Sequence, residues 1–412
     1  MKQGYLSQYF NGVAMKYLSA VEADPNRSNQ HEFNGVGALH KLFGQTLKKI
    51  SFSTRFVYLT DSDDEPVTDE GFLTWYDARQ KAREERGVMR SEYRLYFPSN
   101  LVSQCSAKDD LLLIARKVDD SLLCIIAENG STIAQQLLWL FGFSDSLHPG
   151  FSVKSELETE QDRIGFASRV ILEQIGIDAT EEEPSFLDQM LGMFEGKFPT
   201  TLEFSAYARS TVKEVNSLSD PDAAVMAWME REEILFRTLE KHILGEKLHG
   251  LIQQGEVETE PFMKIALSTL QTRRSRAGAA LENHMEQVFR EHGIQYTRQG
   301  LTEKKHKPDF MFPSISDYHN KDFPVSRLTM LASKTTCKDR WRQILNEAER
   351  IQLKHLLSLE PSISESQTLE MQHEQVQLIL PAGLHNTYTQ RQQHWLMNVS
   401  SFLELVKSRQ SI

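Results

Sequence analysis

The sequence predicts a multidomain chain, in which a strand-rich N-terminal unit precedes an α/β unit whose mixed central sheet is flanked by helices. Short apolar or β-branched runs recur between residues 51 and 128 with turn signals between them, as is typical of a barrel or a sandwich. Beyond residue 196, amphipathic helical segments surround a few short buried strands. These two patterns, one on each side of a polar stretch, determine the predicted fold class.

The first 150 residues are expected to form one domain. The hairpin signal Asp119–Asp120 joins two of its apolar runs, and helices are expected over residues 37–43 and 132–141. Residues 151–195 read as a linker with a flanking helix over 163–176, because they are polar and carry an acidic run broken by Pro184. The second domain is expected over residues 196–412, with a long helix that begins at Asp220–Pro221 and another over 278–292.

Composition excludes several classes of protein. The chain has 412 residues, 40% hydrophobic and 25% charged, which is ordinary for a globular protein. No apolar run approaches the roughly 18 residues of a membrane span, and the N-terminus lacks the apolar core of a signal peptide. The three cysteines form no disulfide framework and no CxxC pair. We therefore expect a cytoplasmic protein without a membrane partner.

The net charge of −11 does not exclude a nucleic-acid partner, because phosphate contacts need only local positive surface. Basic clusters occur in the second half of the chain, over residues 273–276, 304–307 and 338–342.

Three residues in the second domain form a candidate phosphodiesterase site. Asp309 precedes a short apolar strand that ends at Pro313, Lys334 ends a second strand, and Glu347 lies on a helix expected after Thr336. Two carboxylates can hold a hard divalent cation that neutralises an electron-rich phosphodiester, while an ammonium orients the attacking water. The alternative makes Asp309 a turn residue and Glu347 a solvated one.

The same stretch resembles the catalytic core of EcoRII-like type II restriction endonucleases, through PDF at 308–310, SK at 333–334 and KTTCKDRW at 334–341. The usual site of that superfamily has an acid two residues before the lysine, where this chain has Ala332. In the EcoRII-like branch the missing acid lies thirteen residues after the lysine, which is the place of Glu347. The resemblance implies a restriction-endonuclease-like α/β core with Asp309 and Glu347 as Mg²⁺ ligands and Lys334 beside the water.

The first domain also resembles the N-terminal effector domain of these enzymes, a DNA-binding pseudobarrel, through residues 17–44, 71–79 and 111–119. In that fold two arms enter the DNA major groove, and they correspond here to residues 26–34 and 75–83. The expected DNA-binding side chains, which suit contacts to guanine and adenine, are Arg27, Asn29, Gln30, His31 and Arg79. The alternative is a polar surface loop without a ligand.

Two further assignments concern the second domain. Lys338, Asp339 and Arg340 are expected to contact DNA, because an acid and a base side by side can read a C·G pair, and the resemblance assigns this segment to a CC/GG site. Arg340 could instead form an ion pair with Asp339 or Glu347. Glu282 shares a helix face with apolar side chains, so we take it as an auxiliary acid of the site or as an edge carboxylate paired to an arginine.

The resemblance implies a Mg²⁺-dependent, sequence-specific endonuclease that acts on double-stranded DNA as a homodimer and is stimulated by a second DNA copy at its first domain. A cognate DNA methyltransferase would modify the same site and need not bind this chain. The alternatives are a DNA-binding regulator that has lost catalysis and a nuclease for modified DNA.

Overall fold

A computed structural model describes residues 2–23, 31–46, 48–62, 65–87, 89–144, 147, 150–179, 182–253, 256–257 and 259–411. Contacts divide the chain into two units, the first of Met1–Ile175 with Ser362–Ser366 and the second of Gly176–Pro361 with Gln367–Ile412. The stretch over 151–195, which we expected to be a linker with a flanking helix, is thus divided between the two units. Within the described residues, no helix is long and apolar enough to cross a membrane.

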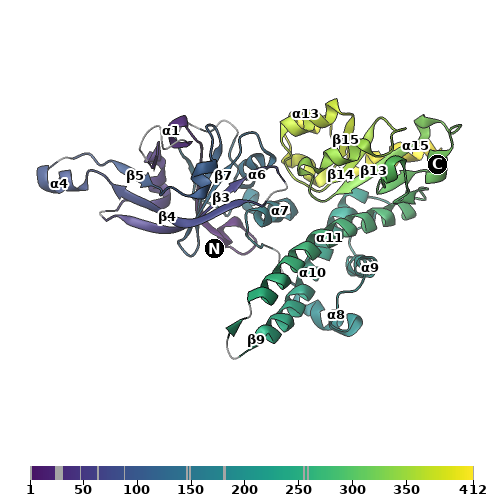
Figure 1. The fold of residues 1–412 in the computed structure, drawn as a ribbon, viewed down its shortest axis with the longest axis horizontal. Coiled ribbons are helices and arrows are strands. Elements are labelled where there is room, and N and C mark those ends of the chain that lie inside the picture. The colour runs from purple at the N-terminus through teal and green to yellow at the C-terminus, as the bar shows by residue number, and fades with distance from the viewer. Residues whose placement is uncertain are drawn as a thin grey trace. The chain divides into compact units, whose positions relative to one another are not determined.

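The first unit is built on one eight-stranded sheet with the order β2-β5-β4-β3-β7-β6-β1-β8. Figure 1 labels β5, β4, β3 and β7 of this sheet. Neighbouring strands are antiparallel except β3 and β7, which are parallel. The strands are β1 (Phe10–Tyr17), β2 (Glu32–Phe33), β3 (Ile50–Leu59), β4 (Val67–Asp77), β5 (Tyr93–Tyr96), β6 (Leu111–Lys117), β7 (Leu122–Ala127) and β8 (Ser152–Lys154). A closed pseudobarrel is not confirmed, because the described strands form an open half-barrel that ends at β2 and β8.

Helices cover this sheet and close its core. Trp75, Leu112 and Ile114 are fully buried in one cluster that continues across the sheet. α6 (Thr132–Phe141) has the predicted bounds and is capped by Ser131, whose hydroxyl accepts the N–H of Ala134. The other elements are η1 (Leu6–Gln8), α1 (Ala20–Ala23), η2 (Val36–Leu39), α3 (His40–Phe43), α4 (Gln80–Arg86), α5 (Leu101–Cys105), η3 (Glu160–Asp162) and α7 (Phe166–Gln174).

The second unit begins with a helical layer. Met190, Phe204 and Leu235 are fully buried in a cluster that joins its first three helices, which explains why their apolar faces recur at helical spacing. The last of the four helices extends well beyond the expected 278–292, starting at Thr259. The elements are η4 (Pro184–Phe186), α8 (Leu187–Phe194), α9 (Thr201–Thr211), α10 (Pro221–Leu251) and α11 (Thr259–Glu291), with the short strands β9 (Ile252–Gln253) and β10 (Glu256–Val257) between the last two.

A five-stranded mixed sheet with the order β11-β12-β13-β14-β15 follows, as predicted. The first two pairs are antiparallel and the last two parallel. Phe289 of α11 contacts Phe310 and Phe312 by its ring, and Phe312 contacts Phe402 of α15, so apolar layers hold helices against the sheet. The strands are β11 (Thr297–Arg298), β12 (Phe310–Phe312), β13 (Thr329–Lys334), β14 (Lys354–Ser358) and β15 (Val376–Ile379).

The remaining elements of the second unit connect and flank these strands. Asp222 at the start of α10 accepts the N–H groups of Ala382, Val399 and Ser400, and so ties α15 to the helical layer. These elements are η5 (Glu303–Lys305), α12 (Ile315–His319), η6 (Val325–Arg327), η7 (Lys338–Asn346), α13 (Glu365–His373), η8 (Ala382–Thr387), α14 (Gln390–Gln393) and α15 (Val399–Gln410).

The segment after Lys334 differs from the prediction. We expected an α-helix there with Glu347 on it, but the segment forms the 3₁₀ helix η7 and Glu347 follows it with extended backbone. Trp341 and Ile344 of this helix are fully buried, and Ala348 takes the left-handed conformation with φ 50°. The spacing of these buried side chains, from which we predicted an α-helix, therefore belongs to a 3₁₀ helix that ends just before Glu347.

Candidate active site

The antiparallel pairing of β12 and β13 positions Asp309. Because Phe310 pairs with Leu331, the residue before Phe310 falls beside the carboxyl end of β13. The backbone N–H of Ser333 donates to Asp309 Oδ2 at 2.7 Å and the Ser333 hydroxyl donates to the same atom at 3.2 Å. The Asp309 carboxylate is thus fixed against the strand end that carries the lysine.

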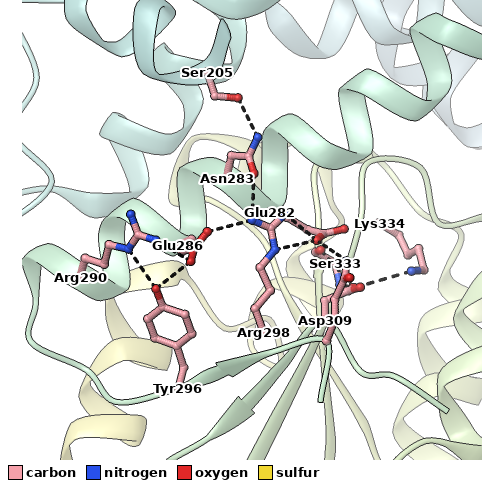
Figure 2. Close-up of polar contacts among 11 residues, drawn as sticks. Ser205, Glu282, Asn283, Glu286, Arg290, Tyr296, Arg298, Asp309, Ser333 and Lys334 are labelled. Carbon is pink, nitrogen blue, oxygen red and sulfur yellow. Dashed lines mark hydrogen bonds and ion pairs between the residues drawn. The ribbon is translucent and has the colours of Figure 1, made fainter. Parts of the chain in front are cut away.

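Lys334 is the last residue of β13 and its ammonium faces this carboxylate, as Figure 2 shows. The Nζ atom lies 3.7 Å from Asp309 Oδ2, and the two side chains are only 21% and 14% exposed. The structure therefore brings the predicted acid and base together at one partly buried place, where charges interact more strongly than in water.

Glu347 completes the group from the far end of η7. Burial first, and then the Asp309 carboxylate, raise the pKa of Glu347 to about 7, against the opposing effect of Lys334 and Lys354. Its Oε2 atom is buried and has no hydrogen-bond partner in the part of the chain that the structure describes. A buried carboxylate oxygen without a donor is costly, and it is the kind of atom that a cation would satisfy.

Glu282 reaches the same place from α11. Burial and, second, the Asp309 carboxylate raise the pKa of Glu282, while its hydrogen bonds with Arg298 lower it. The nitrogen Nη2 of Arg298 lies 2.9 Å from Glu282 Oε2. The two alternatives for Glu282 are therefore compatible, because this acid is paired to an arginine and also lies within the electrostatic reach of Asp309.

The carboxylates fit a hard divalent cation. Oxygen ligands from one or two carboxylates, completed by water and substrate phosphate, are how proteins usually bind Mg²⁺. Among the described residues, no group of three or more His, Cys, Asp or Glu side chains has metal-ligand geometry. The fit therefore rests on the partnerless Oε2 of Glu347 and on the closeness of the Asp309 carboxylate to Glu347 and to Glu282, which helps to raise the pKa of both glutamates.

The recognition residues expected beside the site are only partly described. Lys338 and Asp339 begin η7, but their side chains lie outside the described part of the structure. Arg340 is half-buried, and its backbone N–H donates to the carbonyl of Cys337 at 2.8 Å. Its guanidinium has no hydrogen bond or ion pair with another described side chain, Glu347 included. The alternative of an ion pair with Asp339 lies outside the described side chains.

The expected DNA-contacting arms of the first unit are described in part. Arg27, Asn29 and Gln30 lie outside the described residues. His31 packs its ring against Tyr96 and Phe97. Arg79 directs its Nε atom to Glu92 Oε2 at 2.6 Å, so its guanidinium is held by a carboxylate that Arg94 shares.

The basic clusters over residues 273–276, 304–307 and 338–342 leave fewer cations free to contact phosphate than we expected from the sequence. Arg273 forms a bidentate pair with Glu240, and Arg276 donates to the carbonyl of Pro199 while packing over Phe198. Lys304 pairs with Glu349 and Arg342 with Glu370. Several of these cations therefore have structural partners.

Sequence reasoning missed Arg298, which makes four hydrogen bonds to α11 beside the site (Figure 2). Its strand, β11, is two residues long and leaves no periodic signal. The adjacent Glu282, Asn283 and Glu286, one turn of polar residues on an otherwise apolar helix face, were the signal that could have pointed to a buried cation.

The sequence of the chain is similar to a family of restriction enzymes and to two of its relatives. Residues 236–403 match the family described as EcoRII C terminal. The type II restriction enzyme EcoRII of Escherichia coli is 42% identical over 210 residues, which are 50% of this chain and 50% of that enzyme. The type II restriction enzyme SsoII of Shigella sonnei is 26% identical over 196 residues, 40% of this chain and 63% of its own length. The chain thus spans about half to two thirds of the length of the curated relatives that it matches.

The chain also has low structural similarity to two solved structures. Metal-depleted Ecl18kI in complex with uncleaved, modified DNA has a TM-score of 0.46 at 19% identity, covering 56% of this chain and 85% of that chain. The complex of restriction endonuclease PspGI with substrate DNA has a TM-score of 0.42 at 14% identity, covering 52% of this chain and 94% of that chain.

Proposed function

We propose that this chain, whose residues 236–403 form an EcoRII C-terminal domain, is a Mg²⁺-dependent type II restriction endonuclease that hydrolyses phosphodiester bonds of double-stranded DNA. The observation that carries the proposal is the approach of Lys334 Nζ to within 3.7 Å of Asp309 beside the buried, partnerless Oε2 of Glu347. Two acids and an ammonium at one partly buried place suit attack of water on a phosphodiester.

Each residue has a distinct role in this proposal. Asp309 and Glu347 would hold the Mg²⁺, with Glu282 as an auxiliary acid, and the bound ion would neutralise charge on the scissile phosphate. The Ser333 N–H keeps the Asp309 carboxylate in place, so that its free oxygen need not be reoriented during reaction. The Lys334 ammonium holds the attacking water and offsets the negative charge of the acids around it.

Sequence specificity is proposed to come from the start of η7. Arg340 can donate two hydrogen bonds to guanine O6 and N7, and Asp339 can accept from cytosine N4, which suits a CC/GG site. The support from the structure is that the Arg340 guanidinium has no described side-chain partner and follows closely after the catalytic lysine.

A homodimer is proposed because one site cuts one strand and a duplex has two. A surface stripe on α11 supports it. Glu260, Met263, Leu267, Leu270 and Arg274 follow one another at spacings of three and four residues, and all are exposed, the three apolar ones by 50%, 58% and 51%.

The charges of this α11 stripe favour a second copy of the chain as the partner. Glu260 and Arg274 lie seven residues before and after Leu267, and neither has a described ion-pair partner. In an antiparallel pairing of two copies around Leu267, each Glu260 falls opposite an Arg274, and the apolar side chains meet between them. A parallel pairing would set like charges together.

The first unit is proposed to bind a second copy of the DNA site and to stimulate cleavage. Its support is the separate, strand-rich core of that unit and the resemblance of residues 17–44 to effector domains.

The activity is tested with supercoiled plasmid. We expect cleavage by the wild-type chain in Mg²⁺, none in excess chelator, and none by Lys334→Ala, with fragment ends that fall at one recurring sequence. With Ca²⁺ in place of Mg²⁺, Lys334→Ala should still shift a duplex that carries that sequence, because binding depends on phosphate and base contacts. Specific binding without cleavage by the wild type would favour a DNA-binding regulator. Cleavage restricted to modified plasmid would favour a nuclease for modified DNA.

A further inference from the structure

Arg298 bridges two elements at the edge of the candidate site. It lies on β11, where it pairs with Phe310, and the next residue, Gln299, donates its N–H to the Asp309 carbonyl at 3.0 Å. The backbone of Arg298 is thus fixed relative to Asp309. Its side chain extends to α11, the helix that carries Glu282 (Figure 2).

The guanidinium engages three side chains of one turn of α11. Nε and Nη2 donate to Glu282 Oε2 at 3.2 and 2.9 Å, while Nη1 donates to Asn283 Oδ1 at 2.9 Å and to Glu286 Oε2 at 2.8 Å. An arginine presents its donors in a rigid, planar fork, so these four bonds fix the guanidinium in one orientation.

An outer layer of contacts holds this turn in place. Glu286 Oε1 accepts from the Tyr296 hydroxyl at 2.9 Å and from Arg290 at 2.8 Å. Asn283 donates to the hydroxyl of Ser205 on α9 at 3.1 Å. Because the partners of Arg298 have partners of their own, the orientation of the guanidinium is determined by the fold rather than by solvent.

The bonds to Glu282 are one-sided. Arg298 and Gln299 both donate to Oε2, the latter at 3.3 Å, and within the described residues Oε1 has no hydrogen bond. The Asp309 carboxylate is close enough to affect Glu282. Arg298 therefore occupies one oxygen of Glu282 and leaves the other available to the group of acids that includes Asp309.

We propose that Arg298 is a positioning residue of the nuclease site, which holds Glu282 by its Oε2 atom so that Oε1 is presented to a divalent cation beside Asp309. The inference rests on the proposed function and deepens it, because it assigns the cation-binding role of Glu282 to a specific support. Arg298 also places one positive charge directly beside the Glu282 carboxylate. In this role Arg298 acts through Glu282 and not directly on the DNA or on the attacking water.

The test compares four proteins: wild type, Arg298→Lys, Glu282→Gln and the double variant. Arg298→Lys keeps the charge and loses the fork, and we expect it to lower single-turnover cleavage about 10- to 100-fold and to raise the half-saturating Mg²⁺ concentration by a similar factor. Affinity for cognate duplex in Ca²⁺ should stay within about twofold, since binding depends on other contacts. In the Glu282→Gln background, Arg298→Lys should add little, because the residue that it positions is already altered.

Glu286→Gln is the matched control. It removes the charge of another partner of the same guanidinium but keeps a side-chain oxygen that can accept from Arg298 Nη1. Both bonds to Glu282 also remain, so cleavage should stay within about threefold of wild type. A loss by Glu286→Gln as large as that by Arg298→Lys, or additive losses in the double variant, would show a general structural role and overturn the proposal.

A second readout separates this proposal from the nuclease assignment. Ca²⁺ should raise the thermal unfolding temperature of the wild-type chain. Arg298→Lys should need about 10-fold more Ca²⁺ for the same increase, measured from its own unfolding temperature without Ca²⁺. This measurement holds even if the wild type cleaves no plasmid, in which case the proposed function fails alone. Equal Ca²⁺ dependence in the two proteins rejects the role of Arg298.

Discussion

The backbone N–H of Ser333 donates to Asp309 Oδ2 at 2.7 Å, one residue before the lysine whose ammonium approaches the same oxygen atom. The bond comes from main chain, so it is independent of the side chain at position 333. It ties the acid to the strand end that carries the base, and it makes their relative placement a property of the β12–β13 pairing.

The first prediction follows from that bond. Asp309→Asn should reduce single-turnover cleavage at least about a hundredfold, because a neutral amide binds a divalent cation much more weakly than a carboxylate does. Ser333→Ala should cost less than about tenfold, since it removes the 3.2 Å hydroxyl bond but keeps the 2.7 Å backbone bond. Rapid-quench assays with excess enzyme measure both. Near wild-type cleavage by Asp309→Asn would end the assignment of this site.

The second prediction concerns specificity. Arg340→Ala should weaken binding to cognate duplex by roughly 1–3 kcal/mol and leave binding to a scrambled duplex nearly unchanged. Arg342→Ala serves as the control, because Arg342 already pairs with Glu370. Fluorescence anisotropy in Ca²⁺ at two salt concentrations measures these affinities. An equal loss on both duplexes would make Arg340 a phosphate contact instead.

The third prediction concerns acid stability. His355 is fully buried on β14, and burial first, then the nearby Arg409, lower the pKa of its imidazole to about 4 from the ordinary 6.5. Between pH 6.5 and pH 4, His355 is therefore protonated in the unfolded chain and neutral in the folded chain. The contribution of His355 to the free energy of unfolding is complete above pH 6.5 and is lost as the pH falls toward 4. From this group we expect a loss of about 2 kcal/mol between pH 7 and pH 5.

Urea unfolding at the two pH values checks this loss. His355→Leu should reduce the difference in the free energy of unfolding between pH 7 and pH 5 by about 2 kcal/mol, because leucine has no proton to bind. The exposed His394, replaced by Asn, is the control and should leave the difference as in the wild type. An unchanged difference in His355→Leu would show that His355 is not the group responsible.

The fourth prediction tests the α11 stripe as the dimer interface. Leu267→Glu should weaken dimerisation at least about a hundredfold, because it buries two like charges at the centre of the pairing. Glu260→Arg and Arg274→Glu should each weaken it about 3- to 30-fold, from two lost surface pairs and the repulsion that replaces them. The double reversal should restore the wild-type constant, since the opposite charges again face each other. Sedimentation equilibrium measures these constants, and a Leu267→Glu chain that remains dimeric places the interface elsewhere.

The sequence predicted the parts of the site that depend on burial. The apolar run 310–312 and the mainly apolar stretch 328–333 indicated the two strands, and their ends located Asp309 and Lys334, as the structure has them. Glu347 was found by its spacing from Lys334 in a resembling family, and not by local pattern, since the expected α-helix is the 3₁₀ helix η7. Arg298 was beyond reach, because its role arises from the pairing of a two-residue strand with β12 and from the distance to a helix turn that precedes it by twelve to sixteen residues.

The first unit shows the same limit. Its strand runs were clear, because β3 and β4 alternate over part of their length, β6 begins with five apolar residues and β7 is wholly apolar. The order in which the strands pair could not be predicted, because β1 and β8 lie at one edge of the sheet and β2 lies at the other. Whether a row of strands closes into a barrel depends on these edge partners, which short strands of two or three residues barely mark in the sequence.

The last prediction concerns the division of labour between the two units. The first unit has its own apolar core, and the second contains the whole of the candidate site, with its helices α8, α9 and α10 joined through a separate core. Units with separate cores can fold separately and influence each other through a coupling free energy, typically about 1–3 kcal/mol. We propose that this coupling is inhibitory until the first unit binds a second copy of the DNA site, as the family resemblance suggests.

A chain that begins at Gly176 should then be folded and dimeric, and it should cut single-site DNA about 5- to 150-fold faster than the full chain. The shortened protein should begin at Gly176 and not within α8, because Met190 of that helix is fully buried in one core with Phe204 and Leu235. A short duplex that carries the site, added in trans, should stimulate the full chain and leave the shortened chain unaffected. Circular dichroism and sedimentation confirm that the shortened chain is folded and dimeric before rates are compared. A folded, dimeric shortened chain that is slower on every substrate would show that the first unit contributes affinity and does not inhibit.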